Sequence, residues 1–77
     1  MDALTPGHRV HLASMEATFP GWALVVRDGW WWATKRVPPT PEQIAAGVLP
    51  DFARPGPFEL LAALTVQQGI LMSLGAA

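Results

Sequence analysis

Residues 21–36, with the sequence GWALVVRDGWWWATKR, are the segment that most restricts how this chain can fold. Asp28-Gly29 suits a two-residue type I′ turn, in which both central residues adopt positive φ. The flanking residues are rich in β-branched and aromatic side chains, which favour strands. The segment therefore predicts an antiparallel β-hairpin, and it carries all four tryptophans of the chain.

The position of the turn decides which residues face each other across the hairpin. The predicted opposed pairs are Arg27 with Trp30, Val26 with Trp31, Val25 with Trp32, and Leu24 with Ala33. Side chains alternate between the two faces of a strand. The face predicted to meet the core is almost wholly apolar and consists of Trp22, Leu24, Val26, Trp31 and Ala33. The other face consists of Ala23, Val25, Arg27, Trp30, Trp32, Thr34 and Arg36. A shift of the turn by one residue would exchange the two faces.

A first helix is predicted over residues 6–19. Thr5 can accept a hydrogen bond from an exposed N–H group of the first turn, and Pro6 suits the first helical position. Apolar residues at helical spacing form one narrow stripe, which consists of Leu12, Met15 and Phe19. Pro20-Gly21 should end this helix.

A capping box, Thr40-Pro41-Glu42-Gln43, predicts a short second helix that ends at Gly47. Thr40 can accept from the Gln43 N–H group while the Gln43 side chain reaches back to Thr40. Residues 48–54 are then predicted to form a third strand. Pro50 would confine that strand to the edge of a sheet, because proline cannot donate to a hydrogen-bond ladder.

The last predicted helix begins at Phe58 and is apolar nearly all round, with Glu59 as its only charged residue. A chain of 77 residues cannot easily cover such a helix. Either the helix packs wholly against the hairpin of its own domain, or one of its faces meets a second chain. In the second interpretation the contact residues are Leu61, Leu64, Ile70, Leu71 and Leu74.

The predicted fold is a single α+β domain over residues 1–77, with the apolar C-terminal helix packed on the sheet.

The composition favours surface shared with another chain. Hydrophobic residues make up 51% of the sequence and charged residues 14%, compared with about 25% charged in a typical domain. A chain of this length buries only about 60–65% of the surface that its unfolded form exposes. Cysteine is absent, which excludes disulfides and thiolate zinc sites.

The charge pattern gives no electrostatic footprint for nucleic acid, since five basic residues and a net charge of −1 cannot neutralise many phosphates. Residues 1–6 lack the basic and apolar regions of a signal peptide. The apolar run over residues 60–74 is interrupted by polar residues and is shorter than the about 20 residues that span a bilayer. We therefore expect a soluble, cytoplasmic protein that binds neither nucleic acid nor membrane.

The order of these motifs resembles small uncharacterised proteins of actinobacteria, which have the layout LAxLxxxFPGWxV…GxWWATR…LTxEQxAAGL…ELxxLLxxQ. The matching positions are Leu12, Ala13, Phe19, Pro20, Gly21, Trp22, Trp31, Trp32, Ala33, Thr34, Arg36, Thr40, Glu42, Gln43, Ala45, Ala46, Gly47, Glu59, Leu60 and Gln67 or Gln68. The resemblance covers roughly the whole chain. It implies a compact α+β fold with a short sheet, and it implies no particular activity. The final helix is often polar in those sequences and is apolar in this one.

Two histidines three residues apart, His8 and His11, would share one face of the first helix, with Asp2 or Glu16 as further metal ligands. Zinc sites usually need four ligands, or three and a water. We therefore predict surface histidines and no metal or cofactor.

No serine or threonine has an evident His/Asp partner, and no pair of carboxylates is placed for acid–base catalysis. The sequence thus predicts that the chain is not an enzyme.

Trp30 and Trp32 share the non-core face with Arg27 and Arg36, and two interpretations stay open. The arginines could stack on the indole rings and stiffen the hairpin, or a helix could cover this face. Alternatively, the four residues could bind a partner, because Trp and Arg are enriched in interface hot spots.

The function predicted from the sequence is a non-catalytic protein–protein interaction module, either a homodimer or a subunit of a larger complex. Its contacts would come from the last helix or from Trp30 and Trp32. One alternative is a small-ligand-binding protein with an aromatic pocket between the hairpin and the last helix, lined by Trp30, Trp32 and Phe52. A weaker alternative is a small transcriptional regulator that acts through DNA.

Overall fold

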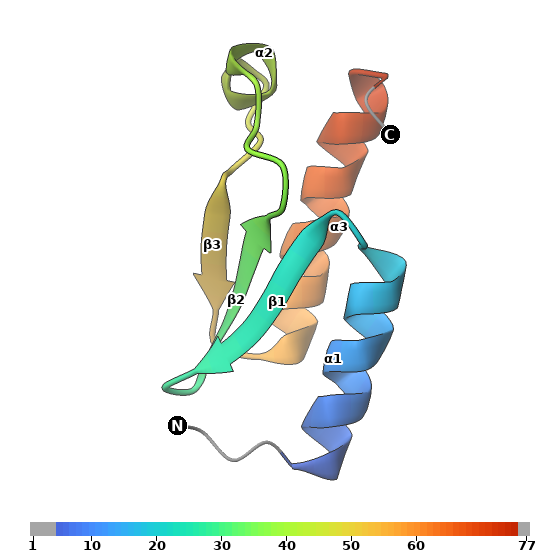
Figure 1. Cartoon of the computed structure of the whole chain (residues 1–77), viewed down its shortest axis with the longest axis vertical. Helices are drawn as coiled ribbons and strands as arrows, with labels where there is room; N and C mark the ends of the chain where they lie inside the picture. Colours follow the sequence, from blue (N-terminus) through green and yellow to red (C-terminus); the bar gives the residue numbers. More distant parts are fainter. Residues whose placement is uncertain (1–4, 76–77) are drawn as a thin grey trace.

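In the part of the chain that the structure describes, the fold consists of a three-stranded antiparallel sheet and three helices (Figure 1). The computed structural model describes residues 5–75. The elements follow in the order α1 (Pro6–Thr18), β1 (Trp22–Arg27), β2 (Trp30–Lys35), α2 (Pro41–Ala45), β3 (Asp51–Arg54) and α3 (Pro57–Ser73). The predicted α+β class is confirmed, and α3 contacts the sheet as expected.

The hairpin has the predicted register. Arg27 is paired with Trp30, and the ladder continues through Val25 with Trp32 to Trp22 with Lys35. Asp28 and Gly29 have φ values of 53° and 77°, as a type I′ turn requires. Because this turn twists in the same sense as the strands that it joins, it holds the ladder in a single register.

The predicted third strand is present at the edge of the sheet, beside β2, but it spans Asp51–Arg54 and not residues 48–54. Ala33 is paired with Phe52 and Trp32 with Ala53. Pro50 precedes the strand, and its carbonyl accepts from the Lys35 N–H group at 2.9 Å. Pro50 therefore lies just outside the strand, where its carbonyl accepts a hydrogen bond and its lack of an N–H group removes no bond from the ladder.

The predicted helix caps are present. Thr5 Oγ1 accepts from the His8 N–H group at 3.1 Å, and Pro6 begins α1. Thr40 and Gln43 form both hydrogen bonds of the capping box, at 3.2 Å and 3.0 Å. Gly47 follows α2 with φ 106°, a conformation that disfavours any residue with a Cβ.

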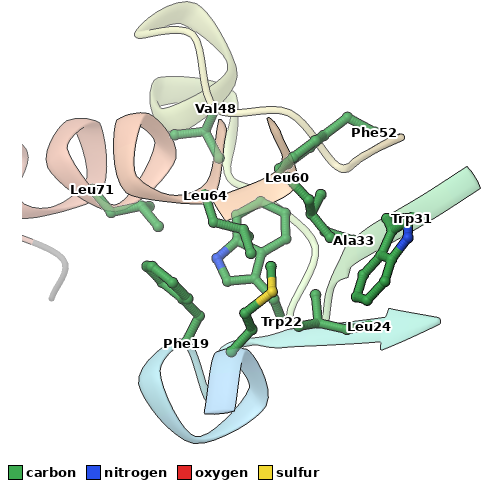
Figure 2. Packing of buried hydrophobic residues seen from close by; sticks show 11 residues of the cluster. Phe19, Trp22, Leu24, Trp31, Ala33, Val48, Phe52, Leu60, Leu64 and Leu71 are labelled. Atoms are coloured by element: carbon green, nitrogen blue, oxygen red, sulfur yellow. The ribbon is translucent and has the colours of Figure 1, made fainter. Parts of the chain in front are cut away.

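The core lies between one face of the sheet and the helices α1 and α3 (Figure 2). The face predicted to meet the core does so, since its residues are buried apart from the partly buried Val26. The rings of Trp22 and Phe52 meet edge to face, with 5.4 Å between their centroids. Among residues 5–75, the buried apolar residues are Met15, Phe19, Trp22, Leu24, Trp31, Ala33, Val48, Phe52, Leu60, Leu64 and Leu71.

Part of the partner contact predicted on α3 is wrong, because two of its residues face the sheet of their own chain. Leu64 is 0% exposed and Leu71 is also buried, so both belong to the core of their own chain. Ile70 and Leu74 are half-buried, and Leu61 is exposed. Leu64 and Leu71 lie seven residues apart, which is two helical turns, so they share the side of α3 that faces the sheet. The predicted contact through these two residues is therefore wrong for the folded chain.

Candidate interaction surface

The face of the sheet that points away from the core is the candidate functional surface, and we refer to it as the open face. In the described part of the chain, α1 and α3 both pack on the opposite side of the sheet. Trp30 is 49% exposed and Val25 is 42% exposed, while Trp32 is half-buried. The strand pairing and the alternation of side chains assign to the open face Ala23, Val25, Arg27, Trp30, Trp32, Thr34, Asp51 and Ala53.

The ladder fixes how these side chains are arranged. Trp32 lies on the central strand, between Val25 on β1 and Ala53 on β3. The next row toward the turn pairs Arg27 with Trp30. The middle of the open face is therefore apolar and contains two indole rings on the central strand.

The two charged residues of the open face lie at opposite corners. Arg27 ends β1 beside the turn. Asp51 begins β3 at the far end of the sheet, in the same row as Thr34 of β2 and Ala23 of β1. Both charged side chains are exposed. Within residues 5–75, neither has an ion-pair partner.

The predicted stacking of Arg27 and Arg36 on the tryptophans is not present among the described residues. Arg54 instead lies over an aromatic ring, with its guanidinium carbon 5.3 Å from the centroid of Phe52. The Arg36 Nε group instead donates to the Pro20 carbonyl at 3.1 Å and ties the end of the hairpin to the loop before β1. Arg27 thus lies on the open face, while Arg36 has a structural partner.

The outer surface of α3 is the second predicted surface. Its exposed large apolar residues are Phe58, Leu61, Val66 and Met72. At 3.6 residues per turn, Leu61 and Met72 lie on one side of the helix and Val66 is about 140° from Leu61. The ring of Phe58 also meets His11 of α1 edge to face, with 5.2 Å between centroids. Phe58 lies between Leu61 and Val66, about 60° from Leu61, so the four residues spread over about 140° of the outward side of α3.

The two histidines pack against aromatic rings. His8 meets Trp31 edge to face at 5.4 Å between centroids, and His11 meets Phe58. No group of three or more His, Cys, Asp or Glu side chains within residues 5–75 is placed to hold a metal ion. Asp2, one of the ligands considered from the sequence, lies outside the described residues.

The predicted aromatic pocket is not formed by the three residues assigned to it. Trp30 and Trp32 lie on the open face, whereas Phe52 is aligned with Ala33 and points into the core. A small cavity of about 140 Å³ does lie between β3 and α3, and its lining residues are Leu49, Phe52, Arg54, Ala63, Val66 and Gln67. Its volume is below the roughly 300–1,000 Å³ of pockets that hold drug-sized ligands.

Gln67 has a role that the sequence did not reveal. It is 6% exposed, and its amide spans the loop between α2 and β3. Its Oε1 atom accepts from the Leu49 N–H group at 2.8 Å, and its Nε2 group donates to the Gly47 carbonyl at 3.2 Å. The available signal was a glutamine inside an otherwise apolar helix, because a buried amide must find hydrogen-bond partners.

No protein-family model, no curated protein and no solved structure matches this chain. The resemblance to actinobacterial proteins therefore stays a prediction. Across residues 5–75, none of the helices has the length and apolarity that would let it cross a membrane.

Proposed function

We propose that this chain is a non-catalytic protein-interaction module and that the open face of its sheet is the binding surface. The observation that carries the proposal is the one-sided arrangement of the described elements. Helices α1 and α3 pack on one side of the sheet, while the other side presents Trp30, Trp32 and Val25. A cytoplasmic setting belongs to the same proposal.

The exposed indole of Trp30 offers substantial binding energy. A tryptophan side chain buries about 150–250 Å² when fully covered. Covering the exposed half of Trp30 therefore removes on the order of 100 Å² from water, which is worth about 2–3 kcal/mol at about 25 cal/mol per Å². Trp32 and Val25 extend this apolar area, and tryptophan and arginine are both enriched at interface hot spots.

The open face is built on paired strands. Trp32 lies on the central strand and is paired on both sides, with Val25 and with Ala53, whereas Trp30 is paired with Arg27 of β1. Preorganised side chains lose less conformational entropy when they bind. On α3, the exposed apolar residues spread over about 140° of the outward side, and the ring of Phe58 also contacts His11.

Site-specific photo-cross-linking tests the proposal. A benzophenone amino acid would replace Trp30 on the open face, Met72 on the outer surface of α3, or Val10 on α1, in cells that naturally produce the protein. All three positions are exposed and apolar, so Val10 is a matched control. We expect a discrete cross-linked protein adduct from position 30 and none from position 10. An adduct from position 72 alone would contradict the proposal, as would the absence of a discrete adduct from position 30.

A further inference from the structure

We infer that the occupant of the open face is a second copy of this chain, packed face to face about a two-fold axis that passes close to Trp32. In this arrangement Arg27 of each copy lies over Asp51 of the other. The inference rests on the proposed function and identifies the binding partner as a second copy of the chain.

The charges of the open face are arranged so that the face complements itself. Arg27 and Asp51 are separated by four residues along the strand direction, about 13 Å, and by two strand spacings, about 10 Å. They are therefore too far apart to pair within one chain. They lie on opposite sides of Trp32, which occupies the centre of the face. Asp28 follows Arg27 but lies in the turn, beyond the last pair of the ladder.

A two-fold axis satisfies both charges at once. In a dimer of this symmetry every contact occurs twice, because the same patch is used on both subunits. The axis must lie in the plane between the two sheets, pass close to Trp32 and run perpendicular to the diagonal from Arg27 to Asp51. Rotation about that axis brings Arg27 over Asp51 of the second copy, and Asp51 over Arg27.

The same rotation gives acceptable packing in the apolar centre. With about 4.8 Å between strands and 3.3 Å per residue, the strands of the two sheets cross at about 110°, close to the near-perpendicular class of sheet packing. Trp32 then meets its own counterpart on the axis. Trp30 comes over Ala53 of the second copy, where a methyl side chain leaves room for an indole ring.

The edges of the sheet give a different way of joining two copies, which the experiment separates. Pro50 and Pro55 flank β3 and limit strand addition there, while β1 has no proline between Trp22 and Arg27. Pairing between two β1 strands would leave Asp51 remote from the contact. The charge of Asp51 therefore matters in the face-to-face dimer and not in an edge-to-edge dimer.

Charge reversal provides the test, with all 77 residues of the chain present throughout. Light scattering after size exclusion would give the mass from about 1 µM to about 1 mM, a range that covers weak and moderate complexes. The variants are Arg27→Glu, Asp51→Arg and the double variant, with Glu42→Arg on α2 as the control. All three positions are exposed, so the folded state should persist, and circular dichroism would confirm it.

We expect the wild-type chain and the control to form a dimer. Each single variant should dimerise on the order of tenfold more weakly, because the symmetry turns one substitution into two like-charge contacts. The double variant should regain the dimer. An equimolar mixture of the two single variants should do so as well. In that mixed dimer one contact joins the introduced glutamate to the introduced arginine, and the other joins the unchanged Arg27 to the unchanged Asp51.

Three results would overturn the inference. One is a monomer at every concentration, and another is a dimer whose dissociation constant is the same in both single variants as in the wild-type chain. The third is a mixture of the single variants that stays monomeric. The cross-linking from position 30 separates these failures from failure of the proposed function. An adduct with a different protein would leave the interaction module intact and remove only the second copy as its partner.

Discussion

Replacing Gln67 by methionine would remove both hydrogen bonds by which α3 holds the loop between α2 and β3. Methionine has about the same length and fills the same space, so the change isolates the loss of polar contacts. The Leu49 N–H group and the Gly47 carbonyl would each lose a partner. Val48, which is buried between them, would lose part of what holds it in the core.

The expected loss follows from these two bonds. A hydrogen bond contributes about 1 kcal/mol net, and a buried group left without a partner costs about 1–3 kcal/mol. Leu49 is 41% exposed, so water can reach this loop and replace part of the loss. We therefore expect the free energy of unfolding to fall by about 2 kcal/mol, which corresponds to a melting temperature about 10 °C lower for a domain of this size.

Urea denaturation followed by tryptophan fluorescence would measure this change, because Trp22 and Trp31 are buried and report unfolding directly. Gln68→Met is the matched control, since it makes the same chemical change one residue along α3 at a half-buried position. We expect the control to stay within about 0.5 kcal/mol of the wild-type chain. Equal losses in the two variants, or no loss from Gln67→Met, would refute the role assigned to the Gln67 amide.

Further substitutions test the packing and the turns. Leu64→Ala should lower the free energy of unfolding by about 3 kcal/mol because Leu64 is fully buried, whereas Leu61→Ala should lower it by well under half as much. Urea denaturation compares the two variants, and equal losses would contradict the assigned orientation of α3. Gly69→Ala should stabilise the chain by about 0.5–1 kcal/mol, since Gly69 lies in a helix and an added Cβ would meet no neighbouring atom. Gly47→Ala should destabilise the chain by at least about 1 kcal/mol, because Gly47 has a φ of 106° that alanine disfavours. Thermal melts should move in opposite directions for these two variants, and a shift in the same direction would count against the backbone argument. Thr40→Ala should cost about 1 kcal/mol through loss of the capping box, and an unchanged melting temperature would show that α2 is held by other contacts.

Local chemistry in the sequence predicted the elements that depend on nearby residues. The turn at Asp28-Gly29 set the hairpin register, and the register set the face on which each tryptophan lies. The capping box at Thr40 and the threonine before α1 likewise predicted where two helices begin. These features are predictable because their hydrogen bonds join residues three or four positions apart, or pairs related by a two-residue turn.

The candidate surface could be predicted in part. Trp30, Trp32 and Arg27 were placed together on the non-core face by strand alternation alone. Whether a helix would cover them was open, because either face of a sheet can receive a helix. Asp51 was not recognised as part of this surface, since its place depends on how β3 pairs with β2, across a connection of fifteen residues from Arg36 to Pro50.

Only the tertiary structure decided the orientation of α3 and the partners of Gln67. A helix that is apolar on nearly every side carries no periodic signal to show which residues face inward. Packing against the sheet made that choice: it buried Leu64 and Leu71 and left Leu61 and Met72 exposed. The sequence by itself determined the hairpin and its two faces through local backbone geometry. Which of those faces remained open, with Arg27 and Asp51 at its corners, was decided by contacts between residues far apart in the chain.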